Sequence, residues 1–73
     1  MQVRARDGRT YDVNLEPPTG SHEVRLEGTL MGVFLLLPTE TKVTVESAPM
    51  TEALLVDIAD RFVSMGGVAM YPR

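Results

Sequence analysis

The feature that most constrains this chain is an uncharged apolar run near its middle. Within GTLMGVFLLLP (residues 28–38), every residue from Leu30 to Leu37 except Gly32 is large and apolar. Elsewhere the sequence alternates apolar and polar residues, a pattern typical of strands with one wet face. A continuously apolar strand is instead covered on both faces. The run therefore requires two covering layers.

The chain has few means of stabilising a small core. Its 73 residues are expected to form one domain, residues 1–73, and such a chain buries only about 60% of the surface exposed in its unfolded form. It has no Cys, which excludes disulfides and thiolate metal sites, and its only His is His22. Small domains without such links rely on a well-packed core or on oligomerisation.

Composition and charge narrow the classes of protein that fit. A net charge of −3 argues against a nucleic-acid binder, because such proteins carry a basic face. The N-terminus begins at once with charged, alternating residues rather than a signal peptide. The apolar run is far shorter than the ~20 residues that span a bilayer. We therefore expect a cytoplasmic protein that binds neither nucleic acid nor membrane.

Residues 1–16 predict a β-hairpin. Apolar side chains at positions 1, 3 and 5 and at positions 11, 13 and 15 alternate with polar ones. A three-residue loop, Arg6-Asp7-Gly8, pairs Val3 with Tyr11 and keeps both apolar sets on one face. This loop needs Gly8 in a left-handed conformation. A two-residue loop would mix the faces, so we expect the three-residue loop.

The rest of the chain predicts further strands and one helix. HEVRLEG places Val24 and Leu26 on one face, and TKVTVES places Val43 and Val45 inward. Between them, either one strand continues through a bulge at a glycine, or GTLMG is a turn before a separate strand VFLLLP. Residues 49–65 have the period of an amphipathic helix, and VAMYPR is expected to form a last strand.

The helix carries recognisable end signals and one predicted ion pair. Ser47 is expected to cap its start, and Gly66 fits the position after its end. Asp57 and Arg61 are four residues apart and should form an ion pair. The sequence therefore predicts an α+β fold: a small, mostly antiparallel sheet of four or five strands, strongly bent, with one amphipathic helix on one face and a short C-terminal strand.

One helix covers one face of a small sheet, so part of the apolar run needs other cover. In a strand, Phe34 and Leu36 lie opposite to Val33, Leu35 and Leu37. Either a strongly bent barrel covers the second face, or a homo-oligomer buries Phe34 and Leu36 between subunits. Burying both side chains contributes roughly 3–6 kcal/mol, comparable with the whole stability of so small a domain. We therefore expect a symmetric dimer, with an interface formed by Leu30, Met31, Val33, Phe34 and Leu36.

The chemistry-bearing residues do not form a catalytic pattern. His22 begins a strand beside Glu23, and neighbouring strand residues point to opposite faces. We expect an exposed or capping histidine. The sequence has no phosphate-binding loop or nucleophile elbow, and no clustered metal ligands. We therefore expect no enzymatic activity, no cofactor and no bound metal.

Two classes of function fit these observations. The first is a non-enzymatic protein-interaction module, a homo-oligomeric accessory or inhibitory factor of the bacterial or phage kind. It would act through an apolar strand surface, either by self-assembly or by docking on a larger protein. The alternative is an oligomeric binder of an anionic metabolite or nucleotide, with an intersubunit pocket in which arginines hold the anion. The candidate ligand-binding residues are Arg4, Arg6, Tyr11, Arg25 and Tyr71.

Overall fold

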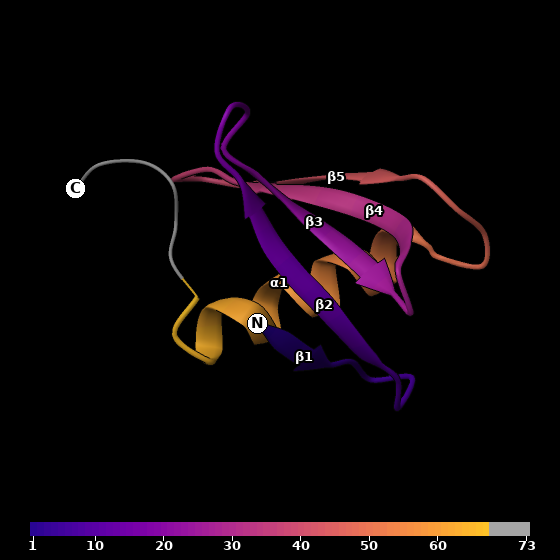
Figure 1. Ribbon diagram of the computed structural model, residues 1–73. Coiled ribbons are helices and arrows are strands. Elements are labelled where there is room, and N and C mark those ends of the chain that lie inside the picture. Colours follow the sequence, from indigo (N-terminus) through magenta and orange to yellow (C-terminus); the bar gives the residue numbers. More distant parts are fainter. Residues whose placement is uncertain (68–73) are drawn as a thin grey trace.

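The computed structural model describes residues 1–67 as one antiparallel sheet with one helix packed on it. Each strand pairs with the next along the chain, so β1 and β5 form the two edges (Figure 1). This confirms the α+β class, the antiparallel sheet and the single amphipathic helix. The elements are β1 (Gln2–Arg4), β2 (Thr10–Glu16), β3 (Ser21–Leu26), β4 (Thr29–Leu36), β5 (Thr41–Val45) and α1 (Glu52–Ser64).

The β1–β2 hairpin has the predicted register and loop. Val3 pairs with Tyr11, and both side chains are buried on the side of the helix. The Ala5 N–H donates to the Arg9 carbonyl at 2.9 Å, which leaves three residues in the loop. Gly8 has a φ of 84°, a conformation that glycine adopts without the strain of a side chain. The alternation was sufficient here because only one register puts the apolar residues of both strands on the same face.

The apolar run follows neither of the two alternatives as stated. The chain turns at Glu27-Gly28, earlier than GTLMG, and a separate strand, β4, then carries residues 29–36 with a bulge. Along β3 and β4, Val24 pairs with Gly32 while Arg25 pairs with Leu30. Met31 is therefore an extra residue in β4. Met31 and Gly32 are consecutive and both buried, and strict alternation resumes after them.

Beyond the bulge, Phe34 and Leu36 face the helix and belong to the core. Phe34 is fully buried and Leu36 is 6% exposed. The predicted strong bend is wrong: the sheet twists between β2 and β5, but it stays open and is not strongly curled (Figure 1). No bend is needed, because α1 covers the inward set of side chains. The helix residues buried against the sheet are Leu55, Ile58, Ala59 and Phe62.

The helix begins later than the sequence predicts. Its N-cap is Thr51, whose Oγ1 accepts a hydrogen bond from the Leu54 N–H at 3.1 Å. Ser47, the predicted cap, instead donates from its Oγ to the Leu30 carbonyl at 2.9 Å. Ser47 therefore attaches the chain before the helix to β4.

Side chains of α1 bind the outer edge of β1. Asp57 and Arg61 form the predicted ion pair at 2.9 Å. Asp57 Oδ2 also accepts the Arg6 N–H at 3.1 Å, and the Arg61 guanidinium donates to the Arg4 carbonyl at 3.3 Å. These bonds occupy backbone groups that would otherwise offer a pairing edge to another strand.

Two further expectations concern the ends and the environment of the chain. The predicted C-terminal strand falls on residues 68–73, outside the described residues. All strands of the sheet described here come from residues 2–45. In the described part of the chain, no helix has both the length and the apolar character needed to cross a membrane.

Gly32 allows α1 to approach the sheet, and its replacement should be costly. A Cβ at Gly32 would lie 2.7 Å from Leu55 Cδ1 and 2.8 Å from the Thr44 carbonyl oxygen. The oxygen cannot move without disturbing the pairing of β4 with β5. We expect Gly32→Ala to lower the free energy of unfolding by about 1–3 kcal/mol, measured by urea denaturation. Thr29→Ala, at an exposed position of the same strand, should change it by less than about 0.5 kcal/mol. Equal midpoints for both variants would contradict this assignment.

Candidate functional site

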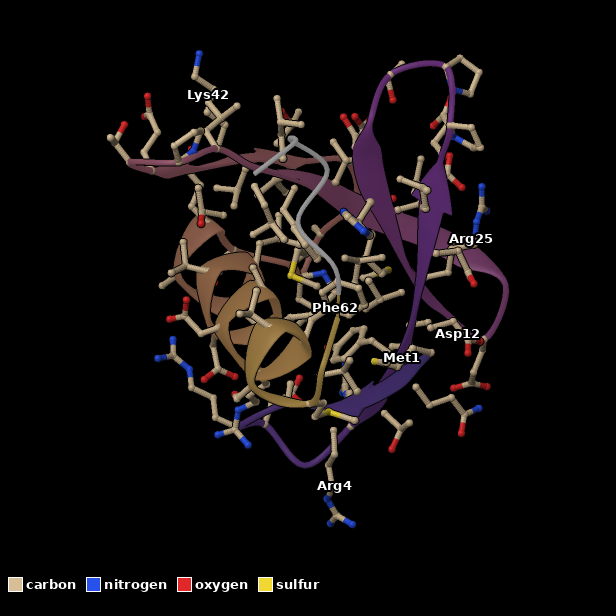
Figure 2. The ribbon with its side chains drawn as sticks, turned by 90° about the vertical axis from the view of Figure 1, so that its left-hand side faces the viewer. Met1, Arg4, Asp12, Arg25, Lys42 and Phe62 are labelled. Atoms are coloured by element: carbon tan, nitrogen blue, oxygen red, sulfur yellow. The ribbon has the colours of Figure 1, made fainter. Side chains whose placement is uncertain are left out.

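An apolar stripe follows β4 on the face of the sheet turned away from the helix. Its side chains are half-buried and alternate with the inward set. We call this surface the β4 stripe; its members are Leu30, Val33, Leu35 and Leu37. In Figure 2, Asp12, Arg25 and Lys42 project from the same open face, whereas Phe62 lies between helix and sheet.

Charged residues of the neighbouring strands flank the β4 stripe. On one side, Arg25 and Glu23 of β3 form an ion pair at 3.2 Å, and Glu23 is the cross-strand partner of Val33. On the other side, Lys42 of β5 is the partner of Leu35. The open face therefore has an apolar centre one strand wide and a polar border.

The predicted interface residues divide between this face and the core. Leu30 and Val33 lie in the β4 stripe, but Met31, Phe34 and Leu36 are buried within their own chain. The expectation that Phe34 and Leu36 need a second subunit to cover them is wrong, because α1 and the sheet already enclose them. The expected dimer itself stays a prediction.

Leu35 and Leu37 were not among the predicted interface residues, although the short β4–β5 loop is a local signal for their place on the open face. The Leu37 N–H donates to the Glu40 carbonyl at 2.9 Å, so the β4–β5 loop is only Pro38-Thr39. This short loop pairs Phe34 with Val43. Cross-strand partners share a face, and the alternation of β5 had already placed Val43 inward.

A second feature is a cavity of about 390 Å³ between the β1–β2 loop and the start of α1. The Tyr11 hydroxyl donates to Asp7 Oδ2 at 2.7 Å, and the Arg9 N–H donates to Asp7 Oδ1 at 2.9 Å. Partial burial acts to raise the pKa of Asp7, but these hydrogen bonds outweigh it and lower that pKa. Burial and the Asp7 contact raise the pKa of Tyr11, which stays a donor. Arg6 completes the polar side of this cavity.

The predicted ligand-binding residues are not all brought together. Arg6 and Tyr11 meet at the cavity beside the β1–β2 loop, where Arg9 joins them. Arg4 lines a different pocket, at the edge of β1. Arg25 lies on the open face in its ion pair. Tyr71 lies outside the described residues.

His22 is buried, which corrects the expectation of an exposed or capping residue. Its ring stacks on Phe34 with centroids 5.1 Å apart and contacts Phe62 at 4.8 Å. The side chain is 3% exposed, and its Nδ1 has no hydrogen-bond partner in the described part of the chain. The alternation that turns Val24 inward also turns His22 inward, so the strand pattern, rather than the residue type, predicts its place.

The surroundings of His22 are those of a core aromatic residue. Burial lowers its pKa, which favours the neutral ring near neutral pH. It borders a cavity of about 330 Å³ together with Met1, Leu15 and Phe62. Among residues 1–67, no group of three or more His, Asp or Glu side chains is arranged to hold a metal ion.

Comparisons with known proteins give no further assignment. No model of a protein family matches the chain, and neither the curated proteins nor the solved structures searched show a significant match. The burial, charge and geometry of the described residues therefore have to distinguish between the possible functions.

The burial of His22 gives stability a defined pH dependence. Because the folded pKa lies below the ordinary value of 6.5, the unfolded chain takes up a proton that the folded chain excludes. Stability is therefore retained above pH 6.5 and falls as the pH drops below it. We expect the urea midpoint to fall between about pH 7.5 and pH 5, and to fall less in His22→Phe. If both proteins show the same slope over this range, His22 does not titrate as proposed.

Proposed function

We propose that this chain is a non-enzymatic protein-interaction module that self-associates through its open sheet face. The observation that carries the proposal is the β4 stripe, which the described part of the chain leaves without a covering layer. Four Leu and Val side chains are only half-buried there. Each square ångström of apolar surface removed from water contributes about 25 cal/mol, so a second chain on this face gains stability from contact.

The border of the stripe supports the same function. Glu23, Arg25 and Lys42 flank it, and protein interfaces commonly combine an apolar centre with a polar rim. Both sides of the stripe therefore offer polar groups that remain solvated when the centre is covered. The assembled form would act as an accessory or inhibitory factor on a larger protein.

The described residues favour binding over catalysis. The one histidine lies between two phenylalanine rings, and burial lowers its pKa. A general acid or base needs a proton path to a substrate, whereas the His22 side chain is only 3% exposed and is packed against aromatic rings. The carboxyl group of Asp7 is occupied by hydrogen bonds within its own hairpin.

Charge placed in the β4 stripe tests the proposal. Leu35→Glu places a carboxylate opposite Lys42, so the single chain keeps a favourable cross-strand pair while the stripe loses its apolar centre. We expect the wild-type protein to associate in a concentration-dependent way and Leu35→Glu to associate at least about tenfold more weakly, the cost of a charge desolvated at an interface. Sedimentation velocity measures both.

Thr10→Glu is the matched control, because Thr10 is exposed near the far edge of the sheet. This variant should associate like the wild type. If Leu35→Glu also associates like the wild type while remaining folded, the β4 stripe is not the contact surface.

A second candidate function is binding of a small anion beside the β1–β2 loop. It is favoured by Arg6 and Arg9 on the wall of the same cavity, with the Tyr11 ring between hairpin and helix. Guanidinium groups bind phosphate oxygens in bidentate geometry. Asp7 opposes an anion there, but its oxygens already accept hydrogen bonds.

Thermal unfolding with added pyrophosphate or ATP tests this second function. We expect an increase in the unfolding temperature, since a ligand that binds only the folded state stabilises it. Arg9→Ala should abolish the increase, whereas Arg25→Ala, on the open face, should keep it. No increase with either compound would exclude these anions as ligands.

A further inference from the structure

The two edges of the sheet differ in how their backbone groups are used. At β1, Asp57 and Arg61 occupy outward groups of Arg6 and Arg4. At β5, the Leu37 N–H bonds to the Glu40 carbonyl and the Glu46 N–H bonds to the Met31 carbonyl, each at 2.9 Å. Bonded pairs alternate along an antiparallel ladder. The residues that direct their N–H and C=O groups away from β4 are therefore Thr41, Val43 and Val45.

The outward groups of β5 are available within the described residues. No hydrogen bond joins them to any other part of residues 1–67. An edge of this kind is a ready template for another strand. Because the side chain of Val45 is 38% exposed, the edge also offers apolar surface on the side of the helix.

Two exposed valines of α1 extend this apolar surface. Val56 is 38% exposed and Val63 is 48% exposed, and residues seven apart lie on one side of a helix. Asp57 and Arg61 occupy the flank that faces β1. The valines lie on the other flank, and α1 packs against β5 as well as β1. Val56 and Val63 thus lie on the side of the helix toward β5.

We propose that two copies of this chain join edge to edge through β5, antiparallel, with Thr44 at the two-fold axis. This contact goes beyond the proposed function: it lies at the edge of the sheet rather than on the open face, and it leaves the β4 stripe uncovered. In this register, Lys42 lies opposite Glu46 of the partner subunit, and Val43 lies opposite Val45 of the partner subunit. The two sheets become one continuous sheet.

Charge favours this register over the two that neighbour it. With Val43 on the axis, Glu40 would lie opposite Glu46 of the partner subunit, and like charges directly opposite are unfavourable. With Lys42 on the axis, two lysines would meet. With Thr44 on the axis, each Lys42 meets a carboxylate. Lys42 and Glu46 are exposed, and neither belongs to an ion pair found in residues 1–67.

The edge contact also brings the β4 stripes of two copies onto one face. The stripe of each copy lies next to its own β5, and strands are spaced about 4.8 Å apart. Two β5 strands therefore separate two parallel apolar bands on the same side of the joined sheet. This arrangement doubles the surface that the module presents to a further protein.

Charge exchange between positions 42 and 46 tests the register. Lys42→Glu and Glu46→Lys each place like charges opposite each other at both ends of the contact. We expect each to weaken association at least about tenfold, measured by sedimentation velocity at low salt. The double variant Lys42→Glu/Glu46→Lys restores opposite charges and should associate like the wild type. An equimolar mixture of the two single variants should form a mixed dimer, detected by native mass spectrometry.

Two further variants complete the experiment. Glu27→Lys makes the same charge change as Glu46→Lys at the exposed β3–β4 turn, and should associate like the wild type. Val43→Pro removes one outward N–H and leaves the bonds to β4 in place; proline is tolerated at such an edge position. Circular dichroism checks that it folds. Weakened association of the folded variant supports the edge contact.

Three results would overturn the edge contact: single charge variants that associate like the wild type, a double variant that stays as weak as the single ones, or a folded Val43→Pro that associates normally. Failure of the edge contact can be distinguished from failure of the proposed function. Loss of association in Leu35→Glu with no effect at positions 42 and 46 retains the β4 stripe and rejects the β5 edge. The reverse result rejects the stripe and retains the edge.

Discussion

The rest of the structure depends on the contact between α1 and the inward side of β4. Near the start of the helix, Leu55 lies against Gly32, where the missing side chain allows close approach. Nearer its end, Phe62 meets Phe34 edge-on at 5.7 Å. These two contacts hold the helix across the sheet and decide which half of the apolar run is enclosed. The other half is consequently left on the open face.

Local periodicity predicted the parts of the fold that alternate. The β1–β2 register, the inward position of Val43 and the Asp57–Arg61 pair all follow from periods of two or about 3.6 residues, and all are present. The apolar run has no alternation, so its own pattern does not show which side chains point toward the helix. The bulge at Met31 and the short loop after Leu37 determine this. Neither is visible in the hydrophobic pattern, which explains why Phe34 was expected on the wrong side.

The candidate sites follow the same rule: contacts within one hairpin could be predicted from the sequence, and contacts that depend on the strand order could not. Arg6 and Tyr11 line the same cavity because they belong to one hairpin. Arg25 belongs to β3 and does not line that cavity. His22 was misjudged from its residue type, although its place in β3 was in phase with Val24. A neutral imidazole is flat and largely apolar on its faces, so stacking on Phe34 partly offsets the cost of burying its polar atoms.

The two uncovered surfaces have the same cause: one helix is too narrow to cover the whole sheet. A single helix cannot cover both faces of a sheet and both of its edges. Here Asp57 and Arg61 bind one edge, β1, from the same helix that covers the inward face. What remains is the opposite face along β4 and the opposite edge along β5, which are neighbours in the sheet. A chain without disulfides gains stability from partners at both surfaces: pairing at the β5 edge satisfies the free backbone groups, and a partner on the open face covers the apolar stripe.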